Sequence, residues 1–254
     1  MAPPLAITSR SLPGRPALDV AFSRALLDLV AEGAAPATLR LYRPDDVLAF
    51  SSLDAASPRL PAALAAARAA GFAPALRLAG GRAAVFHRET LAFAWTLPAA
   101  ESRAGIRERF DAAAALCAGA LRRLGVDARV GAVPREYCPG PHSVNARGRR
   151  KLVGIGQRVV RGAAHVGGVV VVRDSARVRA ALEPVYSALG LDWDPASAGS
   201  IEDEIGRASH EAVVEALRAE LAERFELIPS DEALLDTALA RAARFEPRYA
   251  FKPA

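Results

Sequence analysis

The sequence predicts an α/β (α+β) fold in which a mixed β-sheet is covered by helices. Short runs of alternating apolar residues, typical of strands, are interspersed with segments in which apolar residues recur at helical spacing. Hydrophobic residues make up 52% of the 254 residues, which is enough for a sizeable core. Neither an internal repeat nor a flexible linker is visible. We therefore expect one domain over residues 1–254, with residues 200–254 as a helical C-terminal extension.

The first half of the chain is expected to alternate helices and strands. Apolar periodicity closed by a glycine predicts the helices, and strict alternation predicts the strands. In order, these are a helix over 17–32, strands over 38–42 and 47–50, a helix over 61–71, a short strand from 74, a strand over 91–97 and a helix over 102–124. Gly80 and Gly81 interrupt the apolar run that begins at residue 74. We favour a plain hairpin turn there, and the alternative is a close approach of the backbone to a ligand or to another strand.

The second half begins with a strand and becomes mostly helical. A strand over 126–130 leads into an irregular loop, and apolar runs over 152–160 and 165–172 flank a turn, which predicts a β-hairpin. Ser200 followed by acidic residues is typical of a helix start. The remaining expected helices cover residues 175–189, 210–225 and 231–244.

Composition and charge argue against several function classes. No run of about 18 apolar residues occurs, and the first residues lack a basic region followed by an apolar one, so we expect no membrane span and a cytoplasmic location. The net charge of +5 comes from arginines spread along the chain without interleaved aromatic residues, which argues against nucleic-acid binding. A basic surface equally suits an acidic protein partner.

The chain has two cysteines in different contexts, which does not suggest a disulfide. Cys117 lies on an apolar helical pattern among alanines, and we expect it in the core. Cys138 precedes a Pro-Gly-Pro sequence, whose turn residues place it on an irregular, exposed loop. Because Lys151 begins the next strand, Cys138 is a candidate nucleophile with a cation within reach. A small buried hydrophobe is the alternative interpretation of Cys138.

Three motifs follow one another along the chain. Arg77 precedes Gly80-Gly81, Cys138 precedes Pro139-Gly140, and Lys151 precedes Gly154 and Gln157-Arg158. In this order and separation they resemble the biotin/lipoate protein ligase and octanoyltransferase superfamily, over roughly residues 18–172. The Cys138 motif makes the chain most similar to the cysteine-dependent octanoyl-(glycine cleavage H protein) amidotransferases.

The resemblance implies a lipoate ligase/octanoyltransferase-like catalytic domain, with helices packed over one face of a mixed sheet and an acyl tunnel that opens near Gly80 and Gly81. It implies a transferase that moves an octanoyl or lipoyl group onto a lysine of a lipoyl-domain protein. The implied partners are the glycine cleavage H protein and the acyltransferase subunits of 2-oxoacid dehydrogenases. Two alternatives stay open: an ATP-dependent lipoate-protein ligase that uses Lys151, and a non-catalytic protein that binds an acyl group or a lipoyl domain.

The resemblance assigns catalytic roles to Cys138, as the residue that forms the thioester, and to Lys151, as the cation that faces the acyl carbonyl. Substrate binding is expected at seven further residues, which are Arg77, Gly80, Gly81, His87, His142, Gly154 and Gly156. Apolar side chains at Leu78, Val85 and Ile155 are expected to line the tunnel.

The chain departs from the pattern after the Pro-Gly turn. Those transferases have Tyr-Asp there, whereas this chain has His142-Ser143. The missing aspartate leaves open which carrier donates, which protein accepts, and whether the cargo is octanoyl or lipoyl. His142 is a candidate proton shuttle, because an imidazole titrates near neutral pH, and an exposed loop histidine without a catalytic role is the alternative interpretation.

The expected reaction is a ping-pong exchange that requires no cofactor. Exchange of one lysine amide for another is close to thermoneutral, and no Gly-Lys-Ser/Thr phosphate-binding motif is present, so ATP and Mg are expected only under the ligase alternative. The site should lower the pKa of Cys138, and Arg135, Arg149, Arg150 and Lys151 are candidate sources of positive field. The histidines and cysteines show no zinc spacing, so no metal site is expected.

Overall fold

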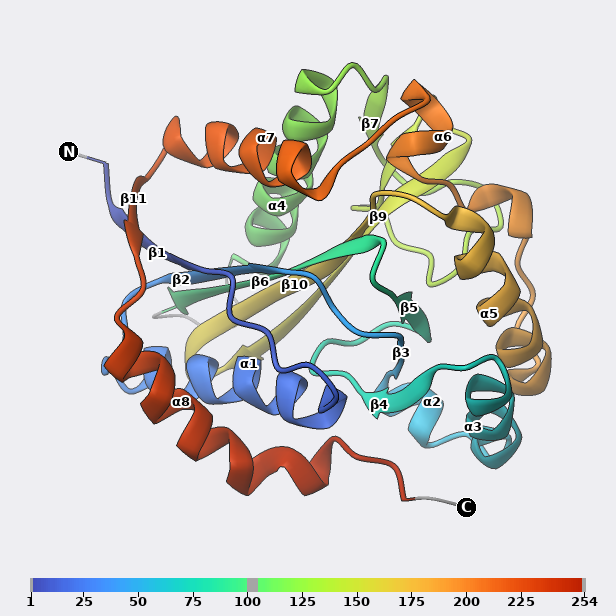
Figure 1. Cartoon of the computed structure of the whole chain (residues 1–254), viewed down its shortest axis with the longest axis horizontal. Coiled ribbons are helices and arrows are strands. Elements are labelled where there is room, and N and C mark those ends of the chain that lie inside the picture. The colour runs from blue at the N-terminus through green and yellow to red at the C-terminus, as the bar shows by residue number, and fades with distance from the viewer. Residues whose placement is uncertain (1, 100–104, 253–254) are drawn as a thin grey trace.

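The structure is a computed structural model that describes residues 2–99 and 105–252. Within these residues, eight strands form a large mixed sheet in the order β11-β1-β2-β6-β10-β9-β8-β7, and three form a small sheet in the order β4-β3-β5 (Figure 1). The strands are β1 (Pro4–Thr8), β2 (Thr38–Tyr42), β3 (Val47–Phe50), β4 (Ala73–Leu76), β5 (Ala84–Phe86), β6 (Thr90–Ala99), β7 (Ala128–Val130), β8 (Val144–Ala146), β9 (Arg150–Val160), β10 (Gly162–Val171) and β11 (Glu226–Pro229).

Helices cover both faces of the large sheet. They are α1 (Pro16–Ala31), α2 (Ser52–Ala55), α3 (Leu60–Ala69), α4 (Ile106–Arg123), α5 (Ser175–Leu189), α6 (Ile201–Ile205), α7 (His210–Ala222) and α8 (Glu232–Phe245), with short 3-10 turns at Pro195–Ser197 and Glu246–Arg248. In Figure 1, α4 and α7 lie on one side of the sheet and α1 and α8 on the other. The expectation that helices cover one face was therefore wrong.

Alternation along β2 explains why both faces are covered. Leu39 and Leu41 pack in the core that includes α4 and α7, whereas Arg40 between them binds Ser23 of α1. Successive side chains of a strand point to opposite faces, so each face needs its own cover. The predicted mixed sheet covered by helices is confirmed, since β1 pairs in parallel with β2 and β11 while β6, β9 and β10 pair in antiparallel fashion.

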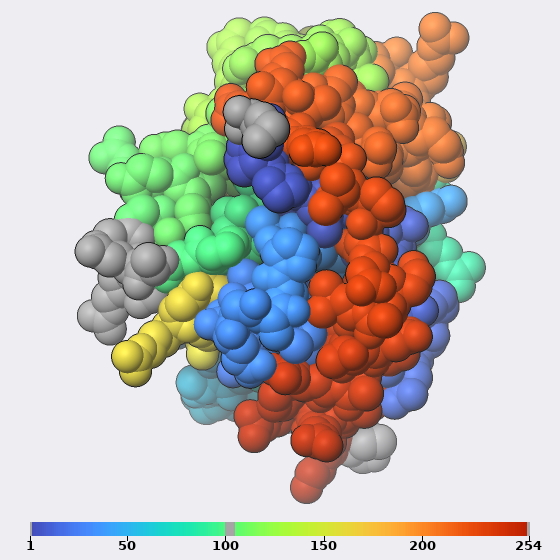
Figure 2. Space-filling model, turned by 90° about the vertical axis from the view of Figure 1, so that its left-hand side faces the viewer, coloured from blue at the N-terminus to red at the C-terminus, as the bar shows by residue number. Residues whose placement is uncertain are grey.

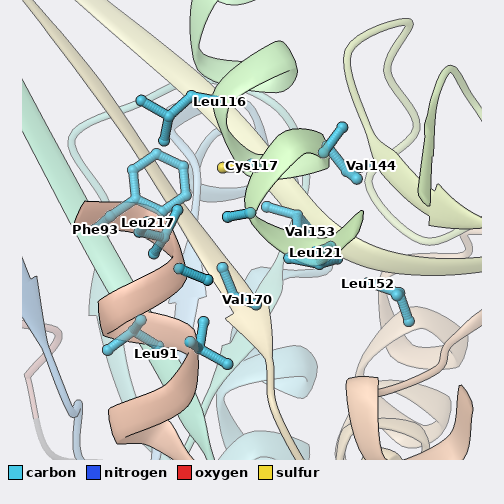
Figure 3. Close-up of a cluster of buried hydrophobic side chains, with 14 of the residues drawn as sticks. Leu91, Phe93, Leu116, Cys117, Leu121, Val144, Leu152, Val153, Val170 and Leu217 are labelled. Atoms are coloured by element: carbon cyan, nitrogen blue, oxygen red, sulfur yellow. The ribbon is translucent and has the colours of Figure 1, made fainter. Parts of the chain in front are cut away.

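The core between the large sheet and α4 contains Cys117. The cysteine is 1% exposed and packs with Leu116, Leu121 and strand residues such as Val153 and Val170 (Figure 3). Burial raises the pKa of its thiol to about 12. The prediction that Cys117 is a core residue is confirmed.

The glycine pair at Gly80 and Gly81 does not form the predicted hairpin turn. Strand β4 before the pair and β5 after it both hydrogen-bond to β3, one in parallel and one in antiparallel fashion. Because β3 lies between them, the connection from Arg77 to Ala83 must cross the end of the small sheet. This crossing carries the two glycines to the site described below.

The C-terminal segment contributes more than helices. Strand β11 pairs in parallel with β1, and α8 packs on α1, so residues far apart in the chain lie side by side. Figure 2 shows β11 and α8 as a column of red atoms along the N-terminal part of the chain. The strand was not expected within residues 200–254. The predicted start of a helix at residue 102 lies outside the described residues, which contain α4 from Ile106 onward.

Candidate active site

Three segments meet at the end of the small sheet: the crossing after β4, the loop between β7 and β8, and the first half of β9. Cys138 lies in the second segment with a φ of 43°, in the left-handed region that non-glycine residues avoid. Two contacts hold it there. Its backbone N–H donates to the Tyr186 hydroxyl at 2.8 Å, and its carbonyl accepts from Lys151 Nζ at 2.7 Å. Tyr186 in turn donates to the Ala83 carbonyl, which ties the loop to β5.

The Cys138 sulfur lies in a positive environment. Sγ is 3.4 Å from the Arg77 guanidinium and 3.2 Å from the Arg82 backbone N–H. Burial alone would raise the pKa of this thiol, but the charges of Arg77 and Lys151, together with the Arg82 N–H, outweigh burial and lower the pKa from its ordinary value. Cys138 is thus more acidic than a free cysteine and differs in this respect from Cys117.

Most of the cations that were expected to lower the pKa of Cys138 do not lie near its thiol. Arg135 pairs with Asp192 at the surface, Arg150 reaches Glu204, and Arg149 is exposed. Among the described residues, Lys151 of the four expected cations and Arg77 contribute the largest charge effects on the thiol. Arg150 points away from Lys151 because neighbouring residues of a strand alternate between faces, and Arg149 lies in the exposed turn before β9.

Lys151 is buried, with 1% of its surface exposed. Its ammonium donates to the Tyr137 and Cys138 carbonyls at 3.0 and 2.7 Å and to Glu136 Oε1 at 3.2 Å, and it lies 4.8 Å from the centre of the Tyr137 ring. Burial lowers the pKa of Lys151, and the charges of Glu136 and Cys138 oppose that effect. Lys151 therefore fastens the cysteine loop to β9.

An apolar cavity extends from Cys138 and Lys151 along the sheet. Its floor consists of glycines on two paired strands, Gly154 and Gly156 of β9 and Gly167 and Gly168 of β10, with Gly156 opposite Gly167. The walls are mostly apolar side chains; they include Val20, Leu78, Ala84, Phe86 and Val169. A Cβ at Gly156 would lie 2.8 Å from the Ala79 Cβ and one at Gly167 would lie 2.6 Å from the His165 ring, so these glycines let two other lining residues approach the sheet.

An open groove lies on the other side of Cys138. It is lined by Gly80, Gly81, Phe110, His142 and further residues of the cysteine loop and β9. Cys138, Ile155 and Gly156 line both this groove and the apolar cavity. The thiol therefore stands at the junction between the apolar cavity and the groove.

Most of the predicted site residues meet at this junction. Arg77, Cys138, Lys151, Gly154 and Gly156 line the cavity, and Gly80, Gly81 and His142 line the groove. Leu78 and Ile155 also line the cavity as expected.

His87 and Val85 lie elsewhere. His87 is buried in the turn between β5 and β6, where its Nδ1 accepts from the Glu89 N–H, and burial lowers its pKa. Val85 packs with α3 and α5 in a separate core. Successive residues of β5 alternate between faces, so Ala84 and Phe86 face the cavity and their neighbours do not.

His142 is held at the rim of the groove. Its Nε2 lies 3.0 Å from Asp111 Oδ1, and its ring stacks on Phe110 with centroids 4.9 Å apart. Both partners belong to α4. The next residue, Ser143, is buried and donates its hydroxyl to Glu136 Oε1 at 2.6 Å.

Several contributors to the site could not be found from the motifs. Tyr186 comes from α5, 48 residues after the cysteine it supports. The Arg82 N–H acts through the backbone, for which side-chain patterns carry no signal. Glu136 offered one signal, a carboxylate two residues before the cysteine, but its partners become visible only in the folded loop.

Replacing Arg77 with methionine should raise the pKa of Cys138, because the nearest cation to the thiolate is lost. At pH 7 the thiolate fraction falls, so iodoacetamide should alkylate Cys138 more slowly, and the midpoint of the rate against pH should move upward. Arg135→Met is the matched control, because that arginine pairs with Asp192 at the surface. Equal midpoints in wild type and Arg77→Met would contradict the assignment.

Gly81→Ala tests the close approach of the crossing to the thiol. Gly81 has a φ of 104°, and a Cβ there would lie 2.8 Å from Cys138 Sγ and closer still to the Arg77 guanidinium. We expect a loss of about 1–2 kcal/mol of unfolding free energy from the backbone, and slower alkylation of Cys138. Gly33 also has a positive φ, of 72°, with no atom near its Cβ, so Gly33→Ala should lose stability without slowing alkylation of Cys138. Urea denaturation and alkylation rates separate the two effects.

No helix in residues 2–99 or 105–252 is long and apolar enough to cross a membrane. The same ranges hold no group of three or more His, Cys, Asp or Glu side chains suited to a metal ion.

The chain matches a known protein family and several named proteins. Residues 15–222 match the family described as Lipoyl protein ligase A/B catalytic domain. The octanoyl-GcvH:protein N-octanoyltransferase of Geobacillus kaustophilus is 28% identical over 170 residues, 67% of this chain and 60% of that protein. The protein of the same name from Exiguobacterium sp. is 28% identical over 180 residues, 67% of this chain and 64% of that protein. The chain thus spans about 60% of the length of these relatives.

Solved structures share the fold. A lipoate-protein ligase A bound with ATP superposes with a TM-score of 0.75 at 20% identity, covering 98% of this chain and 95% of that chain. The bipartite lipoate protein ligase of Thermoplasma acidophilum, described with its E2 lipoyl domain, gives a TM-score of 0.69 at 18% identity and covers 98% and 93%. At these identities the likeness concerns the fold alone.

Proposed function

Since the chain belongs to the lipoyl protein ligase A/B catalytic domain family, we propose that it is an acyltransferase that moves an octanoyl or lipoyl group onto a lysine of a lipoyl-domain protein through a thioester on Cys138. The names of the curated relatives support octanoyl as the cargo and GcvH as a carrier. The observation that carries the proposal is the acidic Cys138 thiol between an apolar cavity and an open groove.

In this proposal the acyl chain of the substrate occupies the cavity, and the lysine that carries it occupies the groove. An acyl chain is apolar and fits the glycine-floored cavity, whose walls are mostly apolar side chains. A lysine that carries or receives the acyl group has to reach Cys138 from the surface, and the groove provides that route. The substrate-binding roles expected for Arg77, Gly80, Gly81, His142, Gly154 and Gly156 fit this division.

The reaction proceeds in two acyl transfers. The Cys138 thiolate attacks the carbonyl carbon of the donor amide, a carbon–sulfur bond forms, and the donor's lysine nitrogen leaves with a proton. The acceptor lysine amine then attacks the thioester, loses a proton, and the thiolate leaves. The sum exchanges one amide for another, so no ATP is consumed and no cofactor takes part.

Lysine and histidine side chains supply charge and protons in this scheme. The Lys151 ammonium lies beside the cysteine backbone and stabilises negative charge as it develops on the acyl oxygen, after exchanging one of its carbonyl partners for that oxygen. His142 stands on the groove side, where the lysine nitrogens enter and leave, and carries the proton between them.

The partners follow from the same chemistry. We infer that the partners are lipoyl-domain proteins, with the octanoylated glycine cleavage H protein as donor and the acyltransferase subunits of 2-oxoacid dehydrogenases as acceptors, and that the enzyme works in the cytoplasm without nucleic acid or a membrane.

The test is a transfer without nucleotide. The protein is incubated with octanoylated H protein, and its intact mass should rise by one octanoyl group, in an adduct that hydroxylamine removes. Addition of an unmodified lipoyl domain should then discharge the adduct onto that domain. Acylation that appears only with free lipoate and ATP would favour the ligase alternative. Binding of the acyl protein with neither adduct nor turnover would favour a non-catalytic binding protein.

A further inference from the structure

Glu136 is a buried carboxylate at the centre of the cysteine loop. It is 2% exposed and belongs to the lining of neither the cavity nor the groove. Its oxygens accept hydrogen bonds from the Val133 N–H at 3.0 Å, the Gly140 N–H at 3.0 Å and the Ser143 hydroxyl at 2.6 Å. These donors lie before and after Cys138, so one side chain closes the loop around the cysteine.

The fourth partner of Glu136 is the Lys151 ammonium, at 3.2 Å from Oε1. The pair is buried on both sides, with side-chain exposures of 1% and 0%. A lysine in such a place tends to lose its proton, because burial disfavours the charged amine. The charged groups that face it are Glu136 and Cys138, which favour the ammonium, and Arg77, which opposes it.

We propose that Glu136 is a positioning residue that keeps Lys151 protonated and directed at the Cys138 loop, so that the thiolate retains its second cation. The connection runs through three side chains. Glu136 accepts from Lys151, Lys151 donates to the Cys138 carbonyl, and the charge of Lys151 acts on the thiol. The proposal deepens the proposed function but is tested on the thiol itself, without any acyl substrate.

Ser143 complements Glu136. Its hydroxyl is a donor, whereas an aspartate at this position would bring a second carboxylate against Glu136 and its charge would be repelled. The His142-Ser143 sequence is thus consistent with a loop in which position 136 holds the carboxylate and position 143 the hydroxyl. Exchange of the two, by Glu136→Ser with Ser143→Asp, leaves the loop with one of each.

The experiment measures alkylation of Cys138 against pH in the full chain carrying Glu136→Gln. The glutamine keeps the shape but removes the charge, so Lys151 becomes a neutral amine and the thiolate loses a cation. We expect the midpoint of the alkylation rate against pH to move upward, and the alkylation rate at pH 7 to fall about tenfold. A bystander anion would give the opposite sign, because removing negative charge near a thiolate favours the thiolate. An unchanged or lowered midpoint therefore overturns the proposal.

Two further variants keep the result interpretable. Glu204→Gln removes another buried carboxylate, 5% exposed and paired with Arg147 and Arg150, and should leave the midpoint unchanged. If Glu136→Gln does not fold, the double variant with serine and aspartate exchanged tests the proposal instead. Glu136→Ser combined with Ser143→Asp should return the midpoint toward the wild-type value from its position in Glu136→Ser, and failure to do so overturns the proposal. Absence of octanoyl transfer by the wild-type protein, while Glu136→Gln still moves the midpoint upward, would count against the proposed function and leave the role of Glu136 standing.

Discussion

Replacing Cys138 with serine should abolish the acyl-enzyme and slow transfer at least about 10³-fold, a loss in the range seen when a covalent nucleophile is removed. The substitution changes one atom, so the cavity and the groove persist. A hydroxyl beside Arg77 and Lys151 stays protonated at neutral pH, however, whereas the thiol there is unusually acidic. Intact-mass analysis after incubation with octanoylated H protein measures the adduct, and gel or mass analysis of the acceptor measures transfer.

Cys117→Ala is the control for this prediction. The residue is packed in the core, and burial raises the pKa of its thiol, so it cannot serve as a second nucleophile. The variant should lose some stability and keep the adduct at Cys138. Transfer at the wild-type rate by Cys138→Ser would rule out the thioester mechanism.

Replacing Lys151 with methionine should have the second largest effect. We expect transfer to slow about 10²–10³-fold, because a cation facing the developing oxyanion is lost. The unfolding free energy should also fall by about 3–5 kcal/mol, because the buried carboxylate of Glu136 loses its counter-ion. Single-turnover kinetics and urea denaturation measure the two quantities separately.

A double variant separates the structural part of this effect from the chemical part. Lys151→Met combined with Glu136→Gln buries no unpaired charge, so stability should recover while transfer stays slow. Recovery of transfer in the double variant would mean that Lys151 serves the loop alone, and that the acyl oxygen is stabilised by other donors.

Elements defined by local patterns could be predicted from the sequence. β2, β3 and α5 have the predicted bounds, because alternation and helical periodicity lie within each segment. The Gly80-Gly81 turn was predicted wrongly because the partner of both flanking strands is β3, which lies well upstream in the chain. β11 was missed because a four-residue edge strand ending in proline carries little alternation.

The site residues likewise divide into those that could be predicted from the sequence and those that could not. Cys138 and Lys151 were identified from motifs, and the structure brings them together with Arg77 and the glycines of β9. The origin of the positive field was mostly mispredicted, because nearness in sequence to Cys138 and Lys151 did not translate into nearness in space for the surface arginines. The roles of Tyr186 and Glu136 depend on how a loop and a distant helix fold together, and residue types alone do not encode that geometry.

The pairing of β1 with β11 has a consequence for biosynthesis. Pro4 lies opposite Glu226, so the N-terminal strand waits for its outer neighbour until almost the whole described chain has left the ribosome. During that interval the free edge of β1 offers unpaired N–H and C=O groups to any passing chain. Nascent molecules therefore carry this unpaired edge until residues 226–229 have been made, and edge-to-edge aggregation is open to them throughout that interval.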